Sequence, residues 1–371
     1  MILLLALLLL QEPPASTSAA LKPYVERREL AGAVALVASK DKILSLEAVG
    51  FQDVAASIPL KTDAVFWIAS QSKPITAAAV MMLVDEGKIA LDDPVEKHLP
   101  EFKGQMVAVE RDADHVLLRK PARPPTIRDC LNHTSGMKFS SPMEKPTLDG
   151  LSLKDAARSY AMMPLESEPG AKYQYSNAGI NTAARILEVV AGVSYEAFMH
   201  DRLFAPLGMK DTTFWPDEGQ LARLAKPYKP NAAKDGLEET TISQLTYPLH
   251  QPHRQPMPAG GLFSTASDCA RFLRMVLHGG ELEGRRYLSE AAVKEMTKRQ
   301  TPEALKDSYG LGWSVGADGY GHGGALATDM RVDAKRGLVL VYLVQHAGFA
   351  GEGKNAQGAF RKTAERLFGG P

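Results

Sequence analysis

The sequence predicts an α+β fold in which one antiparallel sheet of about five strands is flanked by helices and interrupted by an inserted, mostly α-helical lobe. Three observations predict it. Strand-like apolar runs gather near the two ends of the chain, at 31–50 and 311–345. The long segment between them has helical periodicity. Strands at both ends need partners, and the simplest architecture pairs them with each other in a single sheet.

The terminal segments supply the expected α/β lobe, residues 21–69 and 301–371. A short helix is expected at 21–32, and the two strand runs of 31–50 surround the polar turn SKDK, which is typical of a hairpin. The runs LGWSVG, ALATDMRVD and GLVLVYLVQ provide three further strands. A helical tail is expected from about Gln357 to Leu367.

The middle of the chain, residues 70–300, forms the expected helical lobe of the same domain, which spans 21–371. Three of its helical patterns end at glycine, at Gly87, at Gly192 and at the Gly279-Gly280 pair. Residues 224–261 contain repeated prolines and are expected to be a long loop of functional importance. The active site would then lie between the two lobes.

Both cysteines, Cys130 and Cys269, fall in segments expected to be buried helix. We interpret them as free core thiols, although an even count leaves a disulfide between them open.

The first ten residues, MILLLALLLL, are apolar but are far shorter than the ~20 residues that cross a bilayer. Small residues at Ser18 and Ala20 have the spacing of a cleavage site, so a leader is expected at 1–20 and the protein is expected to be secreted or periplasmic. The basic residues that usually precede such a run are missing. The 43 Lys and Arg residues balance 43 Asp and Glu residues without long blocks of one sign, which argues against a nucleic-acid partner.

The pattern Ser-x-x-Lys occurs three times, and only one copy lies at the start of a predicted helix. That copy is Ser70-Gln71-Ser72-Lys73, where Ser70 and Lys73 would share one helix face. A serine with an amine beside it can be a nucleophile with its base. The simpler alternative is that Ser70 or Ser72 caps the helix and Lys73 is a solvated charge.

A second candidate nucleophile is Ser314 in the sequence GWSVG, which formally matches a Gly-x-Ser-x-Gly elbow. That elbow requires a turn from a strand into a helix, whereas no helix follows here. We therefore interpret Ser314 as an ordinary strand residue.

Two further stretches carry polar groups that such a serine would need. Tyr175-Ser176-Asn177 opens a predicted helix, and its simpler interpretation is Asn177 as a helix cap. The stretch DGYGHGGALATD places His322 before Gly323 and Gly324 and leads into a strand, not a helix, so its accidental Gly-x-Gly-x-x-Gly pattern predicts no nucleotide site.

Metal and cofactor chemistry is not expected. His250 and His253 lie in a proline-rich loop, and no His-Glu-x-x-His helix occurs. We interpret His133 as a structural loop histidine bonded to backbone, and Trp67 as a core residue.

The ordered combination Ser-x-x-Lys, Tyr-x-Asn and His-Gly-Gly resembles the serine β-lactamase and penicillin-binding-protein superfamily, in particular its branch of class C β-lactamases, DD-carboxypeptidases and family VIII esterases. The stretches TIRDCLNHTSGM, PLGMKDTTF and AGGLFSTASDCARFL are similar as well, and the likeness covers nearly all of the chain after residue 25. The fold of that family agrees with the architecture predicted above.

The resemblance implies that Ser70 attacks a carbonyl and forms an acyl-enzyme, with proton transfer shared between Lys73 and Tyr175. Which of the two is the resting base stays open. Asn177 would bond Lys73 and the substrate. The backbone N–H groups of Ser70 and Ala325 would form the oxyanion hole.

The same resemblance places His322, Gly323 and Gly324 along the substrate, where class C β-lactamases have Lys-Thr-Gly. The missing lysine charge and threonine hydroxyl would otherwise help to hold a substrate carboxylate. Carboxylic esters are therefore the expected substrates, with β-lactam, amide or D-alanyl-D-alanine peptide hydrolysis as the alternative. A catalytically silent binder of cell-wall fragments is a third possibility.

Overall fold

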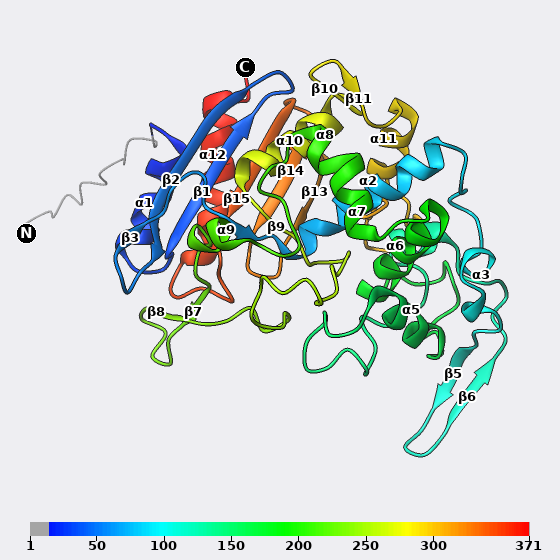
Figure 1. Cartoon of the computed structure of the whole chain (residues 1–371). Helices are drawn as coiled ribbons and strands as arrows, with labels where there is room; N and C mark the ends of the chain where they lie inside the picture. The colour runs from blue at the N-terminus through cyan, green and yellow to red at the C-terminus, as the bar shows by residue number, and fades with distance from the viewer. Residues whose placement is uncertain (1–14, 371) are drawn as a thin grey trace, which may run out of the picture.

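The computed structural model describes residues 15–370, and its centre is a seven-stranded antiparallel sheet (Figure 1). The strand order is β12-β13-β14-β15-β1-β2-β3, so that strands from both ends of the chain meet at the β15–β1 pair. The strands are β1 (Gly32–Ala38), β2 (Ile43–Asp53), β3 (Ile58–Pro59), β12 (Ser314–Gly316), β13 (Gly319–Gly323), β14 (Asp329–Asp333) and β15 (Leu338–Leu343). The expected single sheet is confirmed, and β3 and β13 bring it from about five strands to seven.

Every residue of β1 is buried because both faces of the sheet are covered. Successive side chains of a strand point to opposite faces. Val34 and Leu36 accordingly belong to the large core shared with the helical lobe, whereas Ala33 and Ala35 belong to a second core. That second core lies under α1 (Thr17–Glu26) and α12 (Ala356–Phe368), which pack against each other. The expected terminal helices are thus confirmed.

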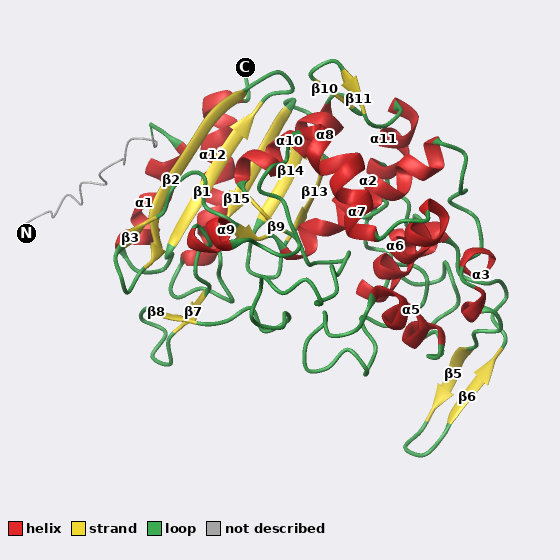
Figure 2. Cartoon of the chain, in the orientation of Figure 1, coloured by secondary structure: helices red, strands yellow, loops and turns green. Residues whose placement is uncertain are grey.

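The helical lobe surrounds α6, which contacts α2, α4 and α5. Figure 2 shows most helices gathered on one side of the molecule, beyond the sheet. The helices between residues 72 and 297 are α2 (Ser72–Asp85), α3 (Val95–His98), α4 (Ile127–Leu131), α5 (Leu153–Ala161), α6 (Asn177–Ala191), α7 (Tyr195–Met199), α8 (Ala205–Leu207), α9 (Glu218–Ala222), α10 (Ala266–Leu277) and α11 (Glu290–Thr297), of which α10 packs on the sheet. The predicted end of α6 is confirmed, since Gly192 adopts a left-handed φ of 71° there.

Four short two-stranded ribbons were not predicted. Their strands are two to five residues long. Such short strands do not show a clear alternation of apolar and polar residues in the sequence. They are β4 (Phe66–Trp67) with β9 (Phe263–Ser264), β5 (Val107–Arg111) with β6 (Val116–Arg119), β7 (Tyr228–Pro230) with β8 (Leu237–Glu239), and β10 (Glu281–Leu282) with β11 (Arg285–Arg286). The expected loop 224–261 therefore contains β7 and β8.

Helix α1 begins at Thr17, four residues before the start expected from the sequence. Its first turn is fixed to β2, because the Glu47 carboxylate accepts hydrogen bonds from Thr17 Oγ1 at 2.9 Å and from Ser18 N at 3.0 Å. Ser16 caps the helix. The leader boundary expected at residue 20 thus falls inside a packed helix, while the apolar run of the leader lies outside the described residues.

The prediction of free cysteine thiols is settled by burial and geometry. Cys130 in α4 and Cys269 in α10 are buried free thiols, so the disulfide left open is not formed. Within residues 15–370, none of the helices combines the length and apolarity needed to traverse a lipid bilayer.

Candidate active site

Ser70 lies in the 3₁₀ turn η1 (Ala69–Gln71), which runs directly into α2. Residues three apart share a face in this geometry, and Lys73 Nζ donates a hydrogen bond to Ser70 Oγ at 3.0 Å. Neither serine caps the helix, since no side-chain capping bond exists there and Ser72 Oγ donates instead to Ala69 O at 2.7 Å. The helix-cap alternative is therefore wrong for both serines.

Lys73 is fully buried, and its only other hydrogen bond among the described residues goes to Ala259 O at 2.7 Å. No carboxylate within the described chain forms an ion pair with it. Burial consequently lowers the pKa of Lys73 well below its ordinary value, because the ammonium form is poorly solvated there. The site favours an uncharged amine next to the Ser70 hydroxyl.

Tyr175 faces the same pair, with Lys73 Nζ 4.6 Å from the centroid of its ring. Burial raises the pKa of Tyr175, and a hydrogen bond with Ser70 opposes that rise only in part. The phenol therefore stays protonated at neutral pH. Burial thus disfavours the charged forms of both groups beside Ser70, the ammonium of Lys73 and the phenolate of Tyr175.

Asn177 is the first residue of α6 and does not cap it; Ser176 does, by accepting a bond from Gly179 N at 3.0 Å. Asn177 is buried, yet its Oδ1 has no hydrogen-bond partner among residues 15–370. The expected bond between Asn177 and Lys73 is therefore not formed. A buried acceptor without a partner is free for an N–H donor of a ligand.

His322 projects from β13 and is held in one tautomer. Its Nδ1 lies 2.6 Å from Gly323 O and must carry the hydrogen, so Nε2 accepts from the hydroxyl of Tyr309 at 2.8 Å. Burial lowers the pKa of His322 to about 3, which keeps the ring neutral. No motif pointed to Tyr309, although it is buried and also packs 4.7 Å from the ring of His133.

His133 is a structural residue as expected, because its Nδ1 accepts a hydrogen bond from Ser176 N at 3.2 Å. That bond ties the loop after α4 to the residue between Tyr175 and Asn177. The buried His133 therefore helps to position Tyr175 and Asn177, the two candidate site residues of the Tyr-x-Asn motif.

A pocket of about 340 Å³ opens above Ser70. None of its lining residues carries a charge. They are Trp67, Ala69, Ser70, Phe139, Tyr175, Asn177, Gln244, Met257, Ala259, Gly260, Gly323, Gly324 and Ala325. The structure thus brings the candidate residues of three distant motifs together, and it leaves Ser314 on β12 outside this lining.

One wall of this pocket comes from the end of the long loop, residues 257–260. Thr76 Oγ1 donates to Pro258 O at 2.7 Å, and Ala259 N donates to Asn181 Oδ1 at 3.0 Å, so α2 and α6 fix the segment. Trp67 Nε1 donates to Gly260 O at 2.7 Å. Trp67 is a core residue, as expected, but it also lines the pocket, which the sequence did not indicate.

The Beta-lactamase family model matches residues 17–364. The chain belongs to the β-lactamase family. Esterase EstB of Burkholderia gladioli is 31% identical over 68% of this chain and 67% of its own length. Penicillin-binding protein 4 of Amycolatopsis lactamdurans is 31% identical over 72% of this chain and 68% of its own. The family therefore includes named esterases as well as penicillin-binding proteins.

The solved structure of EstCE1, described as a hydrolase with promiscuous acyltransferase activity, shares the fold. It superimposes with a TM-score of 0.77 at 22% identity and covers 94% of this chain and 97% of its own. The β-lactamase-type fold predicted from the sequence is confirmed. Within residues 15–370 of this family member, no three His, Cys, Asp or Glu side chains are grouped so that they could hold a metal ion.

The two glycines that follow His322 in this β-lactamase-family site differ in the space around them. A Cβ on Gly324 would lie 2.1 Å from Thr328 Oγ1 and 2.5 Å from Ile68 O, just before the turn that carries Ser70. A Cβ on Gly323 would meet nothing closer than Thr328 O at 3.5 Å. Gly324 therefore lets β13 approach the backbone that carries Ser70.

We expect Gly324→Ala to destabilise the fold by about 1–3 kcal/mol, since the added methyl group overpacks this contact. It should also slow labelling of Ser70 by a fluorophosphonate at least tenfold, because one angstrom of displacement is costly for a positioned nucleophile. The matched control, Gly323→Ala, should melt like the parent protein and should slow labelling much less than Gly324→Ala. Equal labelling rates for the two variants would show that close approach at Gly324 is unimportant.

Proposed function

We propose that the protein is a serine hydrolase that cleaves carboxylic esters through an acyl-enzyme on Ser70. The observation that carries the proposal is the 3.0 Å contact between a buried amine and Ser70 Oγ, where Ser70 lines a pocket without charged residues. The relationship to an enzyme named esterase, at 31% identity, supports it.

In the proposed acylation step, Ser70 Oγ attacks the ester carbonyl and its proton passes to the neutral amine of Lys73. The bond between the carbonyl carbon and the leaving oxygen then breaks, and the departing alkoxide takes a proton from the Lys73 and Tyr175 pair. Water later attacks the acyl-enzyme, which releases the carboxylic acid and restores the Ser70 hydroxyl.

The negative oxygen that develops during both steps needs nearby donors. The backbone N–H groups of Ser70 and Ala325 are the proposed donors, and both residues line the pocket. One such donor contributes roughly 3 kcal/mol to lowering the barrier.

Neutral esters suit this pocket better than substrates with a carboxylate. A carboxylate entering it would lose water without meeting a cation, because no lining residue is charged and His322 is neutral. Gly323 offers no hydroxyl either. The acyl group would instead rest on Trp67, Phe139 and Met257, all of which line the pocket.

Hydrolysis of β-lactams or D-alanyl peptides is the second candidate. It is favoured by the unpartnered Oδ1 of Asn177, which can accept a hydrogen bond from a substrate amide. Relationship to a penicillin-binding protein also supports it. A silent binder of cell-wall fragments is the third candidate, and the aligned Ser70 and Lys73 pair argues against it.

The test compares hydrolysis of short p-nitrophenyl esters with that of a chromogenic cephalosporin. We expect ester turnover to exceed cephalosporin turnover and to fall to background in Ser70→Ala. Ser314→Ala is the matched control, because Ser314 is exposed on β12 and should retain full activity. Turnover that survives in Ser70→Ala would refute the proposal, and faster cephalosporin hydrolysis would favour the second candidate. An absence of any acyl-enzyme by mass spectrometry would favour the binder.

We also propose that the protein is exported and that its leader is removed before Ser16. Cleavage after Ala20 would take away the cap of α1 and the contacts that Thr17 and Ser18 make with Glu47. The intact mass of the exported protein should therefore include residues 16–20. A mature chain that begins at Leu21 would contradict this position.

A further inference from the structure

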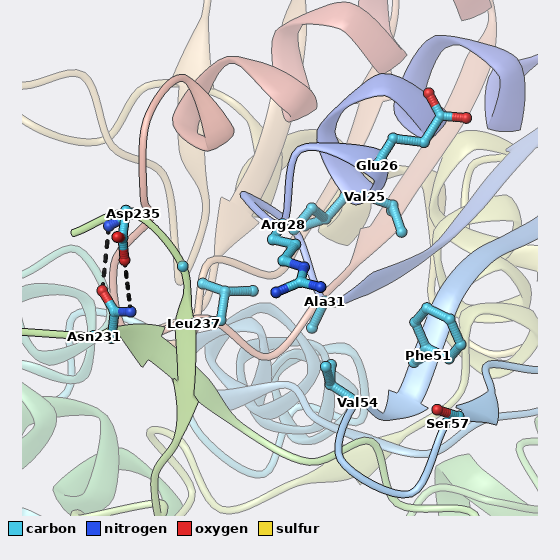
Figure 3. A pocket seen from close by; sticks show the side chains of 12 residues that line it. Val25, Glu26, Arg28, Ala31, Phe51, Val54, Ser57, Asn231, Asp235 and Leu237 are labelled. Carbon is cyan, nitrogen blue, oxygen red and sulfur yellow. Dashed lines mark hydrogen bonds between the residues drawn. The ribbon is translucent and has the colours of Figure 1, made fainter. Parts of the chain in front are cut away.

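A cavity of about 580 Å³, larger than the active-site pocket, lies on the opposite part of the α/β lobe. It is enclosed by the end of α1, the turn after β2 and the β7–β8 ribbon (Figure 3). None of its lining residues belongs to the active-site pocket. Its volume falls within the range of about 300–1,000 Å³ that small-molecule sites occupy.

Arg28 lies at the centre of this cavity, with its side chain directed between the walls (Figure 3). Its backbone N–H donates to Val25 O at 3.0 Å, but its guanidinium makes no hydrogen bond or ion pair with any described residue. Its neighbour Arg27, by contrast, pairs with Glu29 at 2.8 Å and stacks on Tyr24. Arg28 also has a φ of 57°, a left-handed conformation that costs energy in a residue other than glycine. An exposed, unpaired guanidinium therefore lines the cavity, on a residue with left-handed backbone.

The two acidic residues of the lining already have partners. The Glu26 carboxylate forms an ion pair with Lys22 at 3.8 Å and points away from Arg28 in Figure 3. The Asp235 carboxylate accepts a hydrogen bond from Asn231 Nδ2 at 2.9 Å. Of the charged groups that line the cavity, Arg28 is therefore the one without a partner.

The remaining walls combine apolar side chains with the polar residues Ser57 and Asn231. Phe51 and Val54 keep 37% and 39% of their surface exposed, and Leu237 projects toward Arg28 from the ribbon (Figure 3). Exposed apolar side chains around one cation match a ligand that has an anionic head and an apolar body.

We propose that this cavity binds an organic monocarboxylate, with its carboxylate on Arg28 and its apolar part against Phe51, Val54 and Leu237. The guanidinium fork suits a carboxylate because it can donate two parallel hydrogen bonds to it. This second site is independent of the chemistry proposed for Ser70.

The test is calorimetric titration of the full chain with octanoate and with its neutral analogue octanamide. We expect octanoate to bind more tightly than octanamide. Arg28→Gln should weaken octanoate binding by roughly tenfold or more, since a charge-assisted hydrogen bond is lost. Arg27→Gln is the matched control and should bind like the parent, because Arg27 is already paired with Glu29.

A second arm separates this cavity from the active site. Labelling Ser70 with a fluorophosphonate should leave octanoate binding unchanged, and Leu237→Asp should abolish it while ester turnover persists. The proposal is overturned if Arg28→Gln and the parent bind octanoate equally, if octanamide binds as well as octanoate, or if Ser70 labelling removes the binding. Absence of binding at millimolar octanoate overturns it as well.

Discussion

Replacing Lys73 by methionine is expected to lower the rate at which Ser70 is acylated by about 10²–10⁴-fold, the usual contribution of a positioned general base. Methionine keeps an unbranched side chain in the buried space but cannot accept the Ser70 proton. The single-turnover rate with a p-nitrophenyl ester measures the effect. A variant that acylates within threefold of the parent would remove Lys73 from the proposed step.

The pH dependence of acylation tests the same role in the unaltered protein. The neutral amine is the active form, so the rate should rise with pH through the pKa of Lys73 and be lost below it. Because burial lowers that pKa, the rise should come well below the ordinary value of 10.5. His322→Asn should keep this rise, because His322, with a pKa of about 3, titrates only in the acid range.

The lowered pKa of Lys73 also has a consequence for stability. The pKa of Lys73 is lower in the folded protein than in the unfolded chain. At pH values between these two pKa values, the unfolded chain binds a proton that the folded chain lacks. Stability therefore falls in that window as pH falls. Lys73→Met removes this penalty and should melt no lower than the parent at neutral pH. Loss of activity can then be separated from loss of fold.

The opposite pKa shifts favour Lys73 over Tyr175 as the proton acceptor, a choice that the sequence alone left open. The pKa of Tyr175 is raised by burial, so a phenolate would be costly beside Ser70. Tyr175→Phe should accordingly lose less acylation rate than Lys73→Met. The reverse order would make Tyr175 the resting base.

Local geometry explains which parts of the site could be predicted. Ser70 and Lys73 are three residues apart at a helix start, so the sequence alone could place their side chains together. Tyr175 and His322 lie far away along the chain and could be assigned only through family resemblance. Tyr309 contacts His322 through tertiary packing, and nothing in its own sequence context indicates that contact.

Similar reasoning applies to the fold. Helices such as α6 could be predicted because fifteen residues of amphipathic pattern end at Gly192. The wall at 257–260 could be recognised only as part of a long loop. Its conformation depends on hydrogen bonds from Thr76 and Asn181, which belong to other elements.

That long loop is also anchored by a buried ion pair. Arg254 and Asp149 are 2% and 0% exposed, and their side chains meet at 2.6 Å. Arg254 Nη2 donates to the backbone oxygens of Phe214 and Leu249 as well, at 2.8 and 2.6 Å. Asp149 further accepts hydrogen bonds from Thr246. The pair thus ties the loop that supplies one pocket wall to the segment before α5.

Asp149→Ala is expected to lower the free energy of unfolding by about 3–5 kcal/mol, because it leaves the Arg254 charge buried without its counter-charge. Urea denaturation measures the change. The control is Glu238→Ala, which breaks the exposed pair between Lys229 and Glu238 and should cost less than about 1 kcal/mol. A similar, small decrease in the free energy of unfolding of both variants would mean that water reaches Arg254. The KM for esters should also rise in Asp149→Ala, since the pocket wall at Met257 loses its anchor.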